Sequence, residues 1–539
     1  MPFAAALALL AGLYASLAAP AHASTTQISI IEPGPQLNSN PVGTLHTLRL
    51  LGVDEIRLNM GWDNVAPDAT SYKAPKHFNA TNPAAYPAAR WAVFDAIIRD
   101  AQADGIGIDL DVSGRAPLWA MPGHQSVHGQ GSFEPSASDY QAFVQAVGKR
   151  YSGTYTPAHA STPLPDVTFW SVWNEPNYTA SLKPQATGKT GSTLVSPRIY
   201  RGLVDAAWKA LSSTGHRHDK VVIGEMTARG YPDVQGGGMY PLVFLQSLYC
   251  LDSHYHQLRS AAAATLGCPT TASGSRRFSA QNPILFDATG VSSHPYSRWY
   301  PPNVERFSSC RTGLCASLGD IGDLTKAITK VQHAYGSNRQ LPVYSTEYGY
   351  QTSPPKPSYS KKDNNYNVSL ATAADYLNWA EYISYKNPQI VSYDQYLLYD
   401  PKSTTLNNFD PYASGLITWN GHLKPTYYAF RLPLFLPTTT ASSSSQSLEV
   451  WGDVRPAHFA SLDTGGTPQT VEVQFEPKGS STFTTVATET ITNSQGYFDT
   501  HLSFPSSGTV RLAYTYPATD MMLAPGYTVF SRLVSVTVG

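Results

Sequence analysis

A regular alternation of strand-like and helix-like segments between residues 28 and 436 constrains the fold more than any other feature of the sequence. Short runs rich in Val, Ile and Leu recur eight times, and a segment of helical character follows each of them. The predicted strands are 28–33, 53–62, 105–112, 167–175, 220–226, 290–296, 341–349 and 390–400. Eight such units predict an α/β fold of the (β/α)8 barrel type. A doubly wound open sheet is the alternative, but its usual glycine-rich turn does not follow the first strand, which continues as EPGPQLN.

A different pattern begins after residue 436. Residues 437–447 read PTTTASSSSQS, a composition typical of a linker. Short segments of alternating polarity follow, separated by Gly, Pro, Asn and Ser. They predict a small β-sandwich at 448–539, for which we expect an immunoglobulin-like topology. The predicted organisation is therefore a barrel domain at 24–436, a linker, and a C-terminal sandwich.

The first 23 residues have the features of a signal peptide. An apolar run ends at Ala21-His22-Ala23, which fits an A-x-A cleavage signal, although no Lys or Arg precedes the run. We expect removal of residues 1–23 and secretion of the remainder. No other run is long enough to span a bilayer, which needs about 20 apolar residues.

Composition limits the classes of partner. Only 14% of the residues are charged, 12% are aromatic, and the formal net charge is -1. These values give no electrostatic reason to expect a nucleic acid or a membrane surface as partner. They favour an extracellular protein that handles a neutral, amphipathic ligand.

The chain has four cysteines, an even number that suggests disulfides in a secreted protein. We expect the pairs Cys250–Cys268 and Cys310–Cys315, which are close in sequence, although the sequence alone allows three connectivities. Buried free thiols are the alternative. The spacings do not fit a C-x2-C zinc site, and we expect neither a metal nor a cofactor.

The segment TFWSVWNEPNY, residues 168–178, carries the strongest functional signal. Its strand-like half runs directly into Asn174-Glu175-Pro176, and the seventh predicted strand ends similarly at Glu347 in YSTEYGY. In a (β/α)8 barrel the C-terminal strand ends form the active site, so the two carboxylates should meet there. Retaining glycoside hydrolysis needs two such groups about 5–5.5 Å apart, one as acid and base and one as nucleophile.

With these motifs the chain resembles clan A, the large clan of retaining (β/α)8 glycoside hydrolases that includes the cellulase-like family 5 and the xylosidase-like family 39. The resemblance implies that Glu175 is the acid/base and Glu347 the nucleophile. It also implies that Arg57, on the second strand, contacts the nucleophile. His294 and Tyr296, on the sixth strand, match a His-x-Tyr that helps to shape the site.

Other residues are expected to bind the sugar. The amide of Asn174 can bind a ring hydroxyl, and Trp119 and Trp299 follow strands near the same face, where flat rings could stack on sugars. Many clan members end the eighth strand with a stacking Trp. Here SYDQYLLYD offers Gln395 or Tyr396 instead, which leaves the subfamily and the substrate open.

Four further acids lie on the predicted strands: Asp109, Asp111, Glu225 and Asp394. Each is more typical of a hydrogen-bond partner inside the barrel than of a reactant. Glu225 is the substitute nucleophile if Glu347 fails.

The sequence therefore predicts a secreted retaining glycosidase that cleaves O-glycosidic bonds of plant or microbial polysaccharides or oligosaccharides with two glutamates. Two alternatives remain: a transglycosidase using the same site, and a non-catalytic carbohydrate-binding barrel. The sequon at Asn177-Tyr178-Thr179 adjoins Glu175, and a glycan there would crowd it, so we expect a bacterial host. The sugar, the linkage, exo or endo action and the oligomeric state do not follow from the sequence.

Overall fold

The computed structural model describes residues 24–123, 131–188, 191–307, 310, 312–352, 367–402 and 412–539. The predicted signal peptide, residues 1–23, lies outside these ranges. Within them, no helix is both long enough and apolar enough to cross a bilayer.

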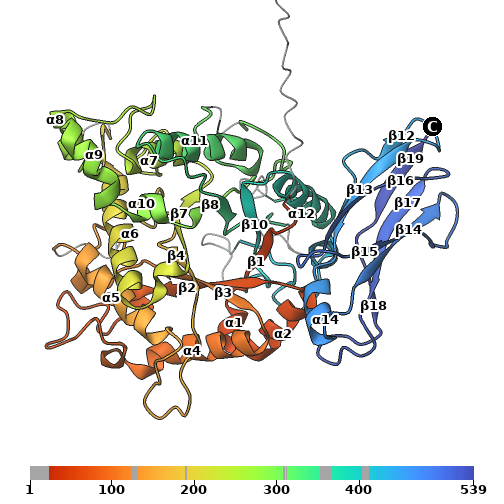
Figure 1. The fold of residues 1–539 in the computed structure, drawn as a ribbon, viewed down its shortest axis with the longest axis horizontal. Coiled ribbons are helices and arrows are strands. Elements are labelled where there is room, and N and C mark those ends of the chain that lie inside the picture. Colours follow the sequence, from red (N-terminus) through yellow and green to blue (C-terminus); the bar gives the residue numbers. More distant parts are fainter. Residues whose placement is uncertain are drawn as a thin grey trace, which may run out of the picture.

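Eight parallel strands close into a barrel, with β1 hydrogen-bonded to β10 (Figure 1). Around the barrel they are β1 (Ile28–Glu32), β2 (Glu55–Gly61), β3 (Gly107–Ser113), β4 (Phe169–Val172), β7 (Lys220–Thr227), β8 (Gly290–His294), β9 (Val343–Ser345) and β10 (Ile390–Tyr396). The predicted (β/α)8 barrel is confirmed. A two-stranded hairpin, β5 (Ala186–Thr187) and β6 (Thr193–Leu194), lies in the connection after β4.

Helices follow the strands and surround the barrel (Figure 1). The longer ones are α2 (Pro41–Leu51), α4 (Ala88–Ala103), α5 (Ala137–Arg150), α6 (Ser196–Ser213), α7 (Pro241–Leu248), α9 (Ala272–Gln281), α11 (Ile321–His333) and α12 (Leu370–Tyr385). Shorter helices are α1 (Gln36–Ser39), α3 (Trp62–Val65), α8 (Ala261–Thr265), α10 (Ile284–Asp287) and α13 (Pro425–Arg431). Several begin with a proline in the first turn, where the missing N–H costs nothing, and Ser136 and Ser369 cap α5 and α12.

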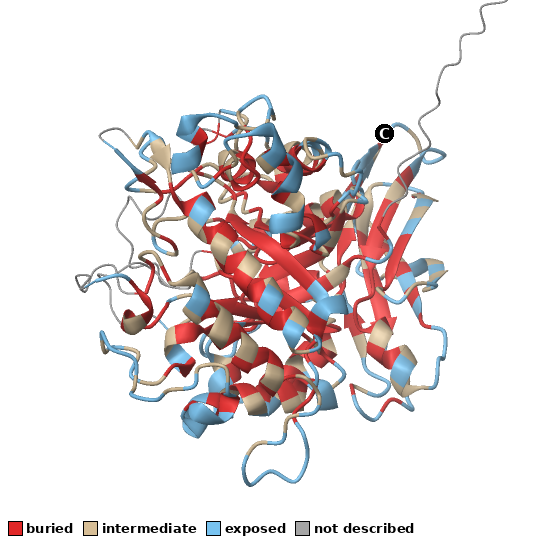
Figure 2. Cartoon of the chain, turned by 60° about the vertical axis from the view of Figure 1, so that its left-hand side comes forward, coloured by how far each residue is buried: buried red, intermediate tan, exposed pale blue. Residues whose placement is uncertain are grey.

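The barrel interior is apolar at one level and polar at the next. Ile30, Phe169, Val222 and Tyr344, from four different strands, form a buried cluster separate from the main core. Side chains alternate along a strand, so Ile30 shares its face of β1 with Glu32 at the C-terminal end. Figure 2 shows burial running the length of the strands. The apolar cluster thus lies beneath the strand ends, where the charged residues gather.

The C-terminal region forms two further sheets. One has the order β11 (Leu434–Phe435), β13 (Ser447–Asp453), β16 (Tyr497–Ser503). The other has the order β12 (Thr440–Ala441), β19 (Val534–Val538), β17 (Gly508–Thr515), β14 (Thr470–Pro477), β15 (Thr484–Thr490), with β18 (Thr528–Phe530) paired to β17. One helix, α14 (Ala457–Asp463), follows β13. The predicted small β-sandwich is confirmed, and its immunoglobulin-like topology stays a prediction.

The segment predicted as a linker, residues 437–447, takes part in this region. It contains β12, which pairs in parallel with β19 through Thr440 and Thr537. The first sheet already begins at Leu434, before that segment. The division into domains therefore stays a prediction, and the chain between the barrel and the sandwich is tied into the sheet.

Both expected disulfides are present. Cys250 is bonded to Cys268, and Cys310 to Cys315, which accounts for all four cysteines. Two disulfides are compatible with an extracellular protein.

Candidate active site

The chain turns sharply as it leaves β4. Trp173 and Glu175 have φ angles of 65° and 46°, in the left-handed region that residues other than glycine seldom adopt. Neighbouring strands hold the turn, because the Asn174 N–H donates to the Ser113 hydroxyl at 3.1 Å and the Glu175 N–H to the Glu225 carbonyl at 3.0 Å. Such strain persists where surrounding structure enforces it, often at functional sites. Here it presents Asn174 and Glu175 at the mouth of the barrel.

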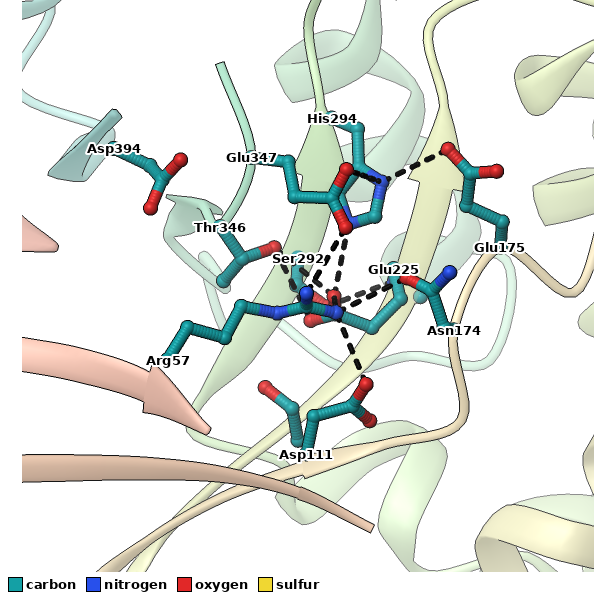
Figure 3. A network of polar contacts seen from close by, with 12 residues as sticks. Arg57, Asp111, Asn174, Glu175, Glu225, Ser292, His294, Thr346, Glu347 and Asp394 are labelled. Atoms are coloured by element: carbon teal, nitrogen blue, oxygen red, sulfur yellow. Dashed lines mark hydrogen bonds and ion pairs between the residues drawn. The ribbon is translucent and has the colours of Figure 1, made fainter. Parts of the chain in front are cut away.

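Arg57, on β2, is the hub of the site (Figure 3). Its side chain is 0% exposed, and its two terminal nitrogens donate to five side chains. The acceptors are Glu32 at 2.6 Å, Glu347 at 2.9 Å, Glu225 at 2.9 Å, Asn174 at 3.0 Å and Asp111 at 3.1 Å. The predicted proximity of Arg57 to Glu347 is thus found, with four more partners around the same guanidinium.

His294 and Tyr296 connect the acids from the β8 side. The Nδ1 of His294 lies 3.1 Å from Glu175 Oε1 and 3.4 Å from Glu347 Oε2, and its Nε2 lies 2.9 Å from Glu225 Oε2. The Tyr296 hydroxyl donates to Glu347 Oε2 at 3.1 Å. Glu347 therefore has donors on both oxygens, with Arg57 on the other one.

Burial separates the two candidate glutamates from Asp111 and Glu225, deeper in the barrel. Glu175 and Glu347 retain 20% and 11% side-chain exposure, whereas Asp111 and Glu225 retain none. One oxygen of Glu175, one of Glu347 and one nitrogen of His294 lie within 4.8 Å of one another. That spacing approaches the value of about 5–5.5 Å typical of a retaining pair, and is well below the roughly 6.5–9.5 Å of an inverting pair.

The same three groups are the only described set of acidic, His or Cys side chains whose donor atoms converge in this way. Such a set could face a cation. Arg57 already places positive charge 2.9 Å from Glu347. That positive charge disfavours a cation at the same place, so we do not interpret the three groups as ligands of an ion.

Burial raises the pKa values of the acids in the site, and the positive charges of Arg57 and His294 lower them. Burial raises the pKa of Glu347 to about 7, against the opposing effect of His294 and Arg57. Burial also opposes ionisation of Glu225, but Arg57 and His294 outweigh it and lower the pKa of Glu225 to about 2. Burial raises the pKa of Asp111 to about 8, despite the neighbouring Arg57. The interior acid Glu225 is thus ionised at neutral pH, while Glu347 titrates close to it.

Two of the residues predicted to bind the sugar, Gln395 and Trp119, use their polar groups in contacts with loops. Gln395 is 0% exposed, and its amide nitrogen donates to the carbonyls of Leu397 and Ser414. Trp119 donates to the Pro67 carbonyl at 3.0 Å and packs edge-on against Trp62. These contacts give Gln395 and Trp119 a role in holding loops together.

Trp299 packs in the loop after β8. Its ring is stacked on Tyr300, and the Arg298 guanidinium lies 4.1 Å from the ring centre. On strand β10 the Tyr396 ring contacts those of Tyr296 and Tyr412. Tyr396, the alternative to Gln395 at this strand end, is therefore the aromatic residue on the catalytic side.

Sequence reasoning overlooked Glu32 and Tyr412. Glu32 is the last residue of β1, so the signal that identified Glu347, a carboxylate at a strand end, was available for it as well. Tyr412 contacts Tyr296 at 5.5 Å between ring centres, but it comes from the long connection after β10. Nothing in the sequence predicts where such a connection folds back.

No family model matches the sequence, and neither does any curated protein. Similar solved structures include a family 39 glycoside hydrolase from the gut symbiont Bacteroides cellulosilyticus WH2, with 15% identity and a TM-score of 0.45 over 89% of this chain and 80% of that one. A family 1 β-glucosidase from Thermotoga maritima has 16% identity and a TM-score of 0.44, over 73% of this chain and 85% of that one. An endo-β-1,4-mannanase from Thermotoga petrophila has 12% identity and a TM-score of 0.40, over 95% of this chain and 98% of that one. Scores this low carry no conclusion about activity, and the barrel assignment rests on the chain's own strand order.

Proposed function

We propose that the protein is a retaining glycoside hydrolase of the clan A type, with Glu347 as nucleophile and Glu175 as acid/base. One observation carries the proposal: the two carboxylates, from the ends of β4 and β9, converge within 4.8 Å while remaining accessible. Asp111 and Glu225 are buried against Arg57, which suits them to supporting charge and not to reaching a substrate.

In the first half of the reaction, ionised Glu347 attacks the anomeric carbon and forms a glycosyl ester. The bond to the leaving oxygen breaks, and that oxygen takes the proton of Glu175. Arg57 and Tyr296 fix the two oxygens of Glu347 by hydrogen bonds at 2.9 and 3.1 Å, so the attacking carboxylate is oriented before substrate arrives.

In the second half, Glu175 acts as a base. Once Glu347 is esterified its negative charge is gone, and Glu175 becomes the ionised member of the pair. It takes a proton from a water molecule, whose oxygen attacks the anomeric carbon and releases Glu347 as a carboxylate. Two inversions at one carbon leave the product with the configuration of the substrate.

Asn174 is suited to bind a sugar hydroxyl next to the reacting bond. Its amide oxygen accepts from Arg57 at 3.0 Å, which fixes the orientation of the amide and turns its nitrogen toward Glu175 (Figure 3). That nitrogen is a donor for a ring hydroxyl. We infer a polysaccharide or oligosaccharide of plant or microbial origin as substrate, for a protein secreted by a bacterium.

The proposal is tested by hydrolysis of a panel of aryl glycosides and polysaccharides by the purified protein. We expect turnover of at least one substrate, loss of activity in Glu347→Ala and Glu175→Ala, and partial rescue of both by azide. The glycosyl azides should have opposite anomeric configurations, because azide replaces the nucleophile in one variant and the attacking water in the other. Glu55→Gln, at the opposite end of the barrel, is the matched control and should remain active.

Two other outcomes correspond to the alternatives. Transfer of the glycosyl group to a second sugar, detected by mass spectrometry, would make the protein a transglycosidase. Sugar binding without turnover, unchanged in Glu347→Gln, would indicate a carbohydrate-binding barrel. Activity that survives Glu347→Ala would overturn the nucleophile assignment.

A further inference from the structure

His294 is enclosed by carboxylates on both sides of its ring. Its side chain is 0% exposed, with Nε2 against Glu225 and Nδ1 against both Glu175 and Glu347. An ionised carboxylate only accepts hydrogen bonds, so a ring nitrogen facing one must carry a proton. The protonation of His294 is therefore tied to the charge of three acids at once.

Glu225, the acid that faces Nε2 of His294, is kept ionised by its neighbours. Arg57 Nη2 donates to Glu225 Oε2 at 2.9 Å, and the Thr346 hydroxyl lies 3.2 and 3.1 Å from the two carboxylate oxygens. With Arg57 and the Thr346 hydroxyl beside it, Glu225 is held as a carboxylate. The Nε2 of His294 is consequently a donor.

Glu175 and Glu347, the acids that face Nδ1 of His294, change their charge during the proposed reaction. A bare Nδ1 would direct its lone pair at two carboxylate oxygens, at 3.1 and 3.4 Å, which is repulsive whenever either acid is ionised. In each half of the double displacement one of Glu175 and Glu347 is ionised. A proton on Nδ1 therefore always has a carboxylate to bond to.

We propose that Glu225 is a positioning residue that keeps both ring nitrogens of His294 protonated, so that the Nδ1–H can bond to whichever of Glu175 and Glu347 is ionised. This inference rests on the proposed function. Before attack the Nδ1–H supports the negative charge of Glu347, and in the ester intermediate it supports that of Glu175. No proton leaves His294, and its hydrogen bond changes partner as the charge moves across the site.

The electrostatics agree with this geometry. Burial alone would lower the pKa of His294, but Glu347, Glu175 and Glu225 raise it well above the ordinary value for histidine. Other charged groups lie behind these three on the remaining strands: Glu32, Arg57, Asp109, Asp111 and Asp394. The test must therefore change Glu225 and leave those groups in place.

The direct test is ¹⁵N NMR of protein labelled at histidine, with His294→Gln used to assign the signal of His294. In the wild type we expect both ring nitrogens to stay protonated from about pH 5 to about pH 8, across the range in which free histidine titrates. In Glu225→Gln, the ring should lose one of its two protons within that range, from Nε2, which then faces a neutral amide. Thr346→Val is the matched control, because it removes a hydrogen bond to Glu225 without removing its charge, and it should behave as the wild type.

A second readout is the pH dependence of kcat/KM on whichever glycoside the protein hydrolyses. Loss of the imidazolium charge in Glu225→Gln raises the pKa of Glu347, so the acidic limb should move up by about one unit or more. Thr346→Val should leave the limb in place. A purely structural role for Glu225 would lower activity without moving the limb.

The outcomes of this inference and of the proposed function are separable, because the NMR measurement needs no substrate. Loss of either ring proton from wild-type His294 near pH 6.5, or identical titrations of wild type and Glu225→Gln, would overturn the role of Glu225 even in an active hydrolase. Doubly protonated His294 in a protein that hydrolyses nothing would support the electrostatic pairing while the proposed function fails. If Glu225→Gln does not fold, the wild-type titration decides alone.

Discussion

Two fully buried arginines, Arg57 in the barrel and Arg455 in the C-terminal region, each gather carboxylates, and they serve different ends. Arg455 forms ion pairs with Glu381 of α12 at 2.5 Å and with Asp453 of β13 at 3.2 Å. Its Nε donates to the Phe430 carbonyl, and its guanidinium lies over the Phe430 ring. This cluster joins the last helices of the barrel to the first sheet of the sandwich.

The two clusters differ in how far solvent reaches their side chains. All side chains of the Arg455 ion pairs are at most 2% exposed, and Trp451, Tyr385 and Tyr497 form an apolar cluster in the same interface. Around Arg57, by contrast, Glu32, Glu175 and Glu347 keep 11–20% exposure at the strand ends. Buried charges cost desolvation in both places. The sealed cluster can therefore fasten two parts of the molecule, whereas the open one can also meet a substrate.

The comparison predicts its largest effect at the open cluster. Glu347→Gln should lower kcat/KM by at least about 10⁴-fold, because the nucleophile is lost while the contact surface is kept. The melting temperature should not fall, since burial, joined by the negative charges of Glu32 and Glu175, outweighs His294 and Arg57 and raises the pKa of Glu347 in the folded protein. Steady-state kinetics measure the loss of kcat/KM, and differential scanning calorimetry measures the melting temperature. A large drop in melting temperature with activity retained would reverse the roles assigned to the two clusters.

At the sealed cluster the effect should be on stability. Arg455→Met leaves Glu381 and Asp453 buried without their partner, and should lower the free energy of unfolding by about 3–5 kcal/mol. Urea denaturation followed by tryptophan fluorescence measures this. The control is Arg511→Met, where an arginine lies between the rings of Phe483 and Phe530 on the sandwich, with an expected cost of about 1 kcal/mol or less. If the two substitutions lowered the free energy of unfolding equally, the ion pairs of Arg455 would contribute no more to stability than the ring contacts of Arg511.

A smaller effect is expected from removing a single donor to the nucleophile. Tyr296→Phe loses the hydrogen bond to Glu347 Oε2 and should lower kcat/KM about 10- to 100-fold, the value of a hydrogen bond to a charged group. Tyr348→Phe is the matched control, because the Tyr348 hydroxyl bonds to Ser297 and Tyr350 instead. A loss as large in Tyr348→Phe would mean that packing, and not the bond to Glu347, explains the result.

The smallest predicted effect is a shift in pH dependence. Glu32 raises the pKa of Glu347, so Glu32→Gln should lower that pKa, and the acidic limb of kcat/KM should move to lower pH by less than about one unit. The sign follows because activity appears as Glu347 loses its proton with rising pH, and a neutral neighbour lets that happen earlier. If the acidic limb of kcat/KM moved to higher pH instead, Glu32 would be shown to favour the ionised form of Glu347, acting through Arg57.

The strands and the two glutamates could be predicted because their signals are local. Each strand is a short apolar run, and Glu175 and Glu347 are carboxylates at the ends of such runs. Apart from Glu347, the partners of Arg57 could not be predicted, because they come from four other strands and depend on barrel closure and register. Only in the closed barrel do Glu32 and Glu225 meet at one guanidinium.

The sequence gives no sign of contacts between distant segments. Residues 437–447 have the composition of a linker, yet Thr440–Ala441 pairs with a strand about a hundred residues later. Trp119 and Gln395 were expected to face a sugar, but loop partners such as Pro67 and Ser414 use their polar groups. Both cases depend on how long connections fold, which hydrophobic periodicity does not predict.

The most direct test of the central claim is the anomeric configuration of the first product. Proton NMR of a hydrolysed aryl glycoside, recorded before mutarotation, distinguishes retention from inversion. The account predicts retention, because the spacing of Glu175 and Glu347 leaves room for a covalent intermediate and not for a water molecule between carboxylate and sugar. A first-formed product of inverted configuration would contradict it, since Glu347 would then act as a base on water.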